Sequence, residues 1–324
     1  MGEGTGVRGG RGSPCIKISP PSPAMSTSAP TPLSARLEVL AAAALFSSGG
    51  AVIKAVHLAG WQVACLRSAI AAATLFVLMP EARRRPTPRV LGVGLAYAST
   101  LILFVLANKL TTAASAIYLQ STAPLYVLLL SPWLLRERIR PRDVVFMVAL
   151  ALGLGLFFVG FDPVSATAPN PSLGNALSLI SGGTWALTIM GLRALGRGQE
   201  SWGPAGAFWG NVFAAAACLP MALPIVVSRS ADWLLVGYLG VCQIGIAYLF
   251  LIRGLQRVRA FEASLLLFLE PVLNPVWAWL VHGERPGPWS LAGGGVILLV
   301  TLVRSLMDAR AGVISEPAFE APRD

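Results

Sequence analysis

The sequence predicts an all-α polytopic membrane protein in which ten transmembrane helices form two inverted five-helix repeats. Three observations support this fold class: the composition, the spacing of the apolar spans and an internal duplication. The 324 residues are 55% hydrophobic and only 12% charged, with a mean hydropathy of +0.68. A soluble domain carries about 25% charged residues. The chain therefore has too little polar surface for a water-soluble globule and uses lipid as its solvent.

The second half of the chain repeats the pattern of the first half. A single offset of 147 residues superposes six positions, namely Ala113 on Ala260, Ala116 on Ala263, Pro124 on Pro271, Glu137 on Glu284, Arg138 on Arg285 and Pro141 on Pro288. The segments that carry these positions are strongly apolar in both copies. Paired apolar halves, each interrupted by a proline, are typical of secondary transporters whose site lies between the halves.

Ten apolar spans follow one another from Arg36 onward. They are 36–56, 61–80, 89–108, 112–135, 143–161, 172–192, 204–227, 232–252, 260–282 and 288–307. Each is roughly 20 residues long, the length at which a helix crosses about 30 Å of hydrocarbon. None alternates with period two, so we expect helices and not the strands of a membrane barrel.

The spans divide the chain into four regions. We expect a first five-helix repeat at 36–161, a second at 172–307, a disordered cytoplasmic tail at 1–35 and a cytoplasmic tail at 308–324. Residues 1–24 are rich in small and polar residues and lack the apolar core of a signal peptide. Because Met25 opens an ordinary start, these residues are either an upstream translation artefact or part of a disordered tail.

Arginines orient the spans in the membrane. With the N-terminus inside, the inner loops carry Arg83, Arg84, Arg85, Arg89, Arg136, Arg138, Arg140, Arg142, Arg193, Arg197, Arg253, Arg257 and Arg259. The outer loops hold only Lys54, Lys109, Arg229 and Arg285. This asymmetry places both termini in the cytoplasm of a multi-pass plasma-membrane protein. It also accounts for most of the net charge of +10 without a nucleic-acid partner.

Charged side chains inside the spans are candidate functional groups, because such charges are costly in hydrocarbon. Glu270 and Asn274 are four residues apart and share a helix face. Glu270 either binds a substrate amine or carries a coupling proton, or else forms a structural ion pair, with Arg67 as one candidate partner. Arg67 in turn is a candidate to grip a carboxylate. The candidate substrate-binding residues are Arg67, Tyr118, Gln120, Trp185, Tyr248, Glu270 and Asn274.

Other residues have a structural and a functional interpretation. Lys54 either snorkels to the interface or contacts a ligand, and we expect Glu262 to pair with Arg257 or Arg259 at the inner interface. Pro124 and Pro271 remove a backbone hydrogen bond and kink their helices, either to gate transport or only to shape packing. With four scattered cysteines and two histidines, no metal and no other cofactor is expected.

The chain resembles the EamA-type members of the drug/metabolite transporter superfamily over residues 36–307. The resemblance rests on the two inverted five-helix repeats, on Pro124 and Pro271 in the fourth helix of each, and on the Arg/Gly-Glu-Arg turns that follow them. Segments 46–54, 61–67 and Leu269-Glu270-Pro271-Val272 also fit. One departure is Arg136, where the second copy has Gly283. The resemblance implies a plasma-membrane carrier that moves small organic metabolites, often outward, by alternating access.

We therefore expect an ATP-independent secondary transporter, with an exporter of amino acids or similar polar solutes as the leading interpretation. A membrane-embedded enzyme acting on lipid-linked intermediates and a structural membrane subunit are the alternatives. The sequence lacks a phosphate-binding loop, a nucleophile elbow and a zinc helix. The expected partners are a metabolite, the lipid bilayer and a proton or counter-solute. A second copy of the chain, in a homodimer, is a further candidate partner.

The charge asymmetry predicts which loops face the outside. In a cysteine-free background, a membrane-impermeant thiol reagent added to intact cells should label Thr167→Cys and spare Thr87→Cys. Thr87 should react only after the membrane is permeabilised. The reverse pattern would refute the orientation.

Overall fold

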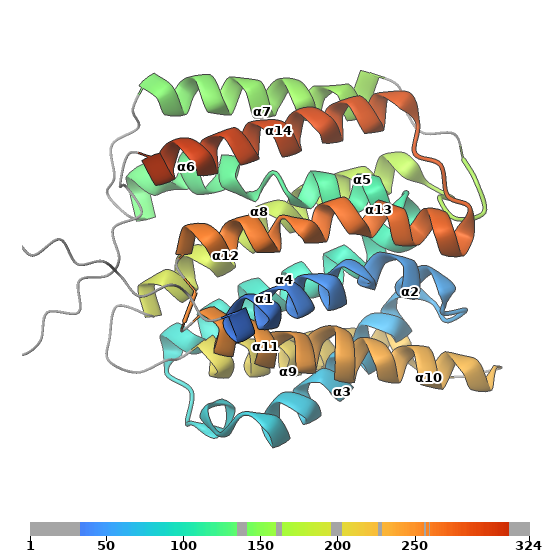
Figure 1. The fold of residues 1–324 in the computed structure, drawn as a ribbon. Coiled ribbons are helices and arrows are strands. Elements are labelled where there is room, and N and C mark those ends of the chain that lie inside the picture. Colours follow the sequence, from blue (N-terminus) through green and yellow to red (C-terminus); the bar gives the residue numbers. More distant parts are fainter. Residues whose placement is uncertain are drawn as a thin grey trace, which may run out of the picture. The chain divides into compact units, whose positions relative to one another are not determined.

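The computed structural model describes residues 33–134, 141–159, 164–195, 203–225, 229–255, 257–258 and 260–310, all within one compact unit. The described residues form helices and one isolated β-bridge between Ser165 and Ala168. The helices lie side by side (Figure 1). In the first half they are α1 (Leu33–Ser47), α2 (Gly49–Ala55), α3 (Gly60–Leu78), η1 (Pro80–Arg83), α4 (Pro88–Leu110), α5 (Ala113–Gln120), α6 (Ala123–Leu134) and α7 (Pro141–Val159). In the second half they are α8 (Pro171–Leu195), α9 (Gly203–Ala222), α10 (Ser230–Tyr238), η2 (Leu239–Ile246), α11 (Ala247–Leu255), α12 (Ala260–Leu267), α13 (Leu269–His282) and α14 (Pro288–Arg310).

These elements make up the ten expected membrane segments. Four segments are composite: α1 with α2, α5 with α6, α10 with η2 and α11, and α12 with α13. Nine segments of the described chain are long and apolar enough to cross a membrane by length and composition. The other is α8, whose 25 residues would span about 37 Å at 1.5 Å per residue.

Helix α8 is less apolar because one of its faces is polar and buried. Its buried polar residues are Asn175, Ser178, Ser181 and Thr188. Leu173 and Ile180, by contrast, are exposed on its outside. The polar face joins neighbouring helices: Thr111 donates to Asn175 at 2.7 Å, and Thr100 donates to Thr184 at 2.9 Å. Helix α8 is therefore polar towards the protein and apolar towards lipid, which lowers its mean hydropathy without making it a surface helix.

Prolines and threonines set the starts of the helices. Helices α4, α7, α8 and α14 each begin at a proline. Proline suits a first helical position because the N–H that it lacks would have no partner there. The Thr87 and Thr112 hydroxyls accept hydrogen bonds from the N–H groups of Val90 and Ser115, at the starts of α4 and α5. These caps satisfy backbone donors that the first turn leaves free.

The duplication reappears as paired interruptions of the fourth helix in each repeat. The first interruption separates α5 from α6 at Ser121 and Thr122, and the second separates α12 from α13 at Phe268. Ser121 and Phe268 are related by the same offset of 147 residues. Pro124 and Pro271 lie within the first turns of α6 and α13. Each proline thus restarts a helix just after the interruption, instead of bending a continuous helix.

The two halves of the chain interleave. Helix α3 packs on α9, α4 packs on α8 and α9, α1 packs on α11 and α13, and α7 packs on α14. Each of these contacts joins a helix of the first repeat to one of the second. The two repeats therefore share extensive interfaces.

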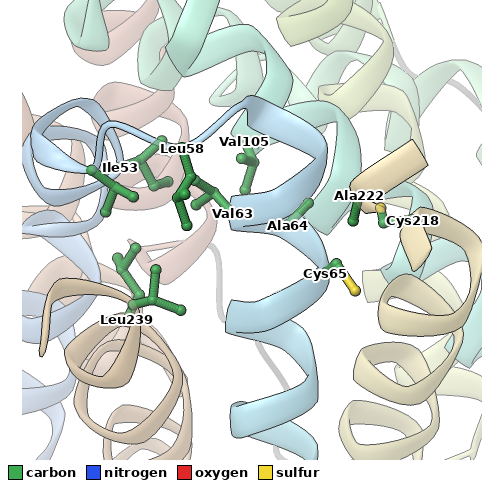
Figure 2. Packing of buried hydrophobic residues seen from close by; sticks show 11 residues of the cluster. Ile53, Leu58, Val63, Ala64, Cys65, Val105, Cys218, Ala222 and Leu239 are labelled. Atoms are coloured by element: carbon green, nitrogen blue, oxygen red, sulfur yellow. The ribbon is translucent and has the colours of Figure 1, made fainter. Parts of the chain in front are cut away.

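Apolar clusters between these helices hold the bundle together. One cluster joins α2, α3, α4, α9 and η2 through small and branched side chains (Figure 2). Cys65 and Cys218 belong to it as free, buried thiols. A separate cluster joins α5, α7 and α14 around Tyr118, Phe157 and Ile297. Many other apolar side chains, such as Trp133 and Leu234, are exposed on the outside of the bundle, as expected for a surface that lipid covers.

The connections gather at two ends of the bundle. Residues 56–59, 111–112, 164–170 and 283–287 lie at the end where α2 and α13 finish, here called the Lys54 end (Figure 1). The opposite end, the Arg257 end, carries three ion pairs: Arg36 with Glu262, Arg257 with Glu38, and Arg304 with Asp143. The loops expected outside and inside are thereby separated at opposite ends.

The packing of α14 on α5 predicts a sharp difference between adjacent glycines. A Cβ at Gly294 would lie 2.2 Å from the Tyr118 ring, whereas one at Gly295 would meet nothing within 4 Å. Alanine gains the same helix propensity at both positions, about 1 kcal/mol. Overpacking should reverse this gain at Gly294, because it typically costs about 1–3 kcal/mol. Gly294→Ala should lower the melting temperature in detergent and Gly295→Ala should not; equal melting temperatures would contradict this packing.

Candidate functional site

The interruption between α12 and α13 places Glu270 inside the bundle. Glu270 is the second residue of α13, directly after the break at Phe268. Its side chain is partly exposed, and no described residue forms a hydrogen bond or ion pair with it. The Tyr97 and Tyr248 hydroxyl groups lie within its electrostatic range. An acidic group without a protein cation is thus available to a ligand or to a proton.

Arg67 on α3 is fully buried and poorly partnered. The residue is 1% exposed, its Nη2 donates one long hydrogen bond of 3.5 Å to the Leu101 carbonyl, and its Nε has no partner. No carboxylate of the described chain pairs with it, so the structure does not show the ion pair with Glu270 that the sequence allowed. Because an uncompensated buried charge is strongly destabilising, Arg67 is suited to receive an anion.

An aromatic group lies near both charges. The Tyr97 ring centroid is 5.7 Å from that of Tyr248 and 6.2 Å from that of Trp185, and Phe46 meets Tyr248 at 5.5 Å. Tyr97 and Tyr248 are within electrostatic range of Arg67 as well as of Glu270. Together, Arg67, Tyr97, Trp185, Tyr248 and Glu270 are called the central cluster. Apolar walls with a few convergent polar groups are the usual composition of a small-molecule site.

Gln120 joins α5 to the small-residue stretch of α8. Its Nε2 donates to the Ser181 hydroxyl at 2.8 Å, and that hydroxyl donates to the Thr100 carbonyl at 3.3 Å. A Cβ at Gly182 would lie 3.1 Å from the Leu119 carbonyl. The small residues of α8 therefore allow close helix packing at this position.

Asn274 faces α2 and α4. It is completely buried, and neither its amide nitrogen nor its amide oxygen has a hydrogen-bond partner. A Cβ at Gly50 would lie 2.7 Å from Asn274 Oδ1 and 3.0 Å from Asn108 Oδ1. Gly50 thus allows two buried carboxamides from different helices to approach the broken first segment. Neighbouring unsatisfied polar groups are uncommon inside proteins and are frequent at functional sites.

Tyr118 lies apart from the central cluster. Its ring packs against Gly294 of α14 and belongs to the apolar cluster of α5, α7 and α14. The sequence made Tyr118 a candidate substrate-binding residue, but α5 turns it towards α14. We infer a packing role.

Two charged residues have ion-pair partners that the sequence did not indicate. Lys54 does not snorkel, because its side chain is 3% exposed and forms an ion pair with Glu284 at 3.1 Å. Glu262 pairs with Arg36 at 2.5 Å, and Arg257 binds Glu38; Arg259, the other partner expected for Glu262, lies outside the described residues. The reason is that α1 packs beside both α11 and α12, and so supplies acidic and basic partners from its first turns. Glu137 and Arg138 lie outside the described residues.

Sequence reasoning missed the contributions of Asn108 and Gln243. Gln243 lies in a π-helical turn, η2, and its side chain reaches the broken first segment beside Gly49. Short π-helical turns are frequent at functional sites. No pattern in a single sequence indicates a π-helical turn. Asn108 could have been noticed as an asparagine inside an apolar span.

Comparison with known proteins identifies the family. The model of the EamA-like transporter family matches residues 34–159 and, a second time, residues 172–306. The chain belongs to the EamA-like transporter family. The pseudopaline exporter CntI of Pseudomonas aeruginosa is 26% identical over 268 residues, which cover 80% of this chain and 92% of that protein. An uncharacterized transporter of Archaeoglobus fulgidus is 26% identical over 219 residues, which cover 68% of this chain and 77% of that protein.

The fold has a counterpart among solved structures. A crystal structure of a chain 22% identical in sequence superposes with a TM-score of 0.56, over 86% of this chain and 98% of the other. At this identity the likeness shows the fold alone. The family and the curated relatives show a multi-pass membrane protein that transports small solutes, and they indicate a transporter rather than an enzyme.

The separation of the two tyrosines predicts different consequences for loss of a hydroxyl group. Tyr248→Phe removes a hydroxyl from the central cluster, so it should reduce transport several-fold in proteoliposomes. Tyr118→Phe keeps the ring that fills the space beside Gly294, so transport should stay near the wild-type rate. The assay would use the solute that a panel of labelled metabolites identifies. Equal effects of the two changes at matched protein levels would contradict this assignment.

Proposed function

We propose that this EamA-family protein is an ATP-independent secondary transporter that exports small carboxylate-bearing solutes, such as amino acids. The observation that carries the proposal is the burial of Arg67 without a carboxylate partner in the described chain. The carboxylate of a solute would supply the missing charge, with bidentate geometry available to the guanidinium group. Binding would remove the free-energy cost of an unpaired buried cation, and the solute-bound state would be favoured for that reason.

Two opposite charges in one aromatic cluster suit a zwitterion. Arg67 would hold the carboxylate, and Glu270 would accept hydrogen bonds from an ammonium group. The rings of Tyr97, Trp185 and Tyr248 would cover the apolar part of the solute, since aromatic side chains offer large contact areas and stack readily on cations. Gln120 on α5 and Asn274 on α13 are the remaining polar candidates and would select among polar groups.

Glu270 is also the residue that we propose exchanges a proton for the solute. Intramembrane carboxyl groups recur in proton pathways because hydrocarbon disfavours their charge. If one proton binds Glu270 whenever the ammonium group leaves, the site never holds an isolated negative charge. Exchange against a counter-solute would satisfy the same condition.

Alternating access would use the helix interruptions as hinges. The breaks at Ser121 and Phe268 stand at equivalent positions of the two repeats, each followed by a proline. Discontinuous helices at the repeat interface are the usual sites of binding and movement in such carriers. We propose the plasma membrane as the location, with both termini in the cytoplasm, from the arginine distribution. The exporter relative supports the outward direction.

The test is transport by proteoliposomes that contain only this protein. With a proton gradient and no ATP, the wild type should accumulate a labelled amino acid from the panel. Glu270→Gln should abolish proton-driven accumulation, because it removes the titratable group but keeps the side-chain size. Arg67→Gln should raise the solute concentration needed for half-maximal transport.

Glu137→Gln is the matched control, because Glu137 is the repeat-related counterpart of Glu284 and lies in a loop between apolar spans. It should transport like the wild type, because the sequence predicts that Glu137 lies outside the membrane spans. Accumulation that requires ATP after every gradient is collapsed would overturn the proposed function. Equal losses in the Glu270 and Glu137 variants would overturn the role of Glu270.

A further inference from the structure

Lys54 forms a buried connection between four segments at the Lys54 end. Its Nζ donates to the Thr111 carbonyl at 2.7 Å and to the Thr167 carbonyl, and it lies 3.1 Å from Glu284 Oε2. The side chains of Lys54 and Glu284 are both 3% exposed. The pair thus ties α2 to the α4–α5 turn, to the connection before α8 and to the turn after α13.

Glu284 has a second task at the start of α5. Its Oε1 accepts a hydrogen bond of 2.5 Å from the backbone N–H of Ala113, the first residue of α5. A carboxylate stabilises a helix N-terminus through this bond and through the helix dipole. Its other oxygen, Oε2, faces Lys54 without a hydrogen bond of good geometry. The same carboxylate therefore caps the first half of the interrupted fourth segment and neutralises Lys54.

A movement that separated Lys54 from Glu284 would be costly inside the protein. Removing one member of a buried ion pair is strongly destabilising, because the other charge stays unpaired. A second carboxylate that takes the place of Glu284 beside Lys54 would avoid this cost. Such a carboxylate needs a path from the solvent to the buried pair.

A pocket of about 290 Å³ lies directly beside the pair. Thr112, Thr167, His282, Glu284 and Arg285 belong to its lining, so Glu284 stands between the pocket and Lys54. The volume is sufficient for a small metabolite. Arg285 is exposed and forms no ion pair with a described residue. Two cations, Lys54 and Arg285, thus accompany the one carboxylate of Glu284, and the excess charge attracts anions.

We propose that this pocket, here called the vestibule, binds the carboxylate of a small solute, and that the bound carboxylate replaces Glu284 as the partner of Lys54. Arg285 receives the solute at the mouth of the vestibule. The exchange moves one carboxylate away from Lys54 as another arrives, so the charge of Lys54 stays compensated throughout. The released Glu284 enters the polar vestibule and no longer holds Ala113.

The exchange loosens α5. Without Glu284, the start of α5 loses a carboxylate that stabilises the helix N-terminus. The other end of α5 is already interrupted at Ser121. Occupancy of the vestibule therefore weakens the start of a short helix, which keeps only its Thr112 cap there. The biological meaning rests on the proposed transport function, in which the vestibule is the entry or exit site of the carboxylate-bearing solute.

Thiol accessibility at the start of α5 tests the proposal without a transport measurement. Ala113 is completely buried, so Ala113→Cys in a cysteine-free background reports when α5 moves. The probes are propionate and propionamide, which have similar shapes and differ in charge. On the purified full-length protein in nanodiscs, millimolar propionate should increase the rate of labelling by a polar maleimide several-fold, and propionamide should leave it unchanged.

Three further variants, each added to Ala113→Cys, locate the effect. Arg285→Gln should keep the basal labelling rate and lose the propionate response. Arg229→Gln is the control, an exposed arginine at the same end that contacts His57 instead, and it should respond like the parent. Glu284→Gln should label several-fold faster without any probe, because an amide neither neutralises Lys54 nor caps α5 with a charge. An unchanged melting temperature of Arg285→Gln confirms that its fold is retained.

Equal responses to propionate and propionamide, a retained response in Arg285→Gln, or slow labelling of Glu284→Gln would each overturn the proposal. These outcomes are separate from the proposed transport function. If the protein transports solute but fails this labelling test, only the proposal for the vestibule is refuted. If the protein passes the labelling test but transports no solute, only the proposed transport function is refuted.

Discussion

A helix interrupted within hydrocarbon leaves backbone groups that lipid cannot satisfy, and this constraint organises the structure. Such interruptions are stable only where other helices surround them or where they border a polar cavity. The breaks at Ser48, Ser121 and Phe268 obey this rule: each lies inside the bundle, and each is accompanied by polar side chains. Ser121 and Ser48 donate to their own helices, at the Ile117 and Leu45 carbonyls. The ends freed by these breaks place Glu270 and Asn274 inside the bundle.

The fold was predictable from the sequence to a large extent, because lipid imposes a simple rule on composition and length. The ten spans and the duplication follow from apolar runs and one constant offset. The two prolines predicted kinks, whereas the structure has helix interruptions just before them. Helix α8 also shows where composition is insufficient. Its polar residues recur every three or four positions on one face, so the average hydropathy falls although the helix lies within the bundle.

The candidate site was predictable only in part. Tyr248 interacts with both Arg67 and Glu270, and Trp185 packs beside Tyr97, but a binding role for these residues stays a prediction. Tyr118 lies apart from them, because a helical face is defined only after its neighbours are known, and α14 covers that face. The pairing of Lys54 with Glu284 joins residues 230 positions apart and depends on how three loops meet. Contacts of this kind follow from tertiary packing, which one sequence does not display.

The polar face of α8 has a consequence for assembly. A helix whose inward side carries Asn175, Ser178 and Ser181 gains less from entering lipid alone than its nine more apolar counterparts. Much of the free energy that holds it in place comes from polar partners in the first repeat. These include Thr100 on α4, Thr111 at the connection between α4 and α5, and Gln120 on α5. The first repeat therefore supplies polar partners that lipid cannot offer to the opening helix of the second.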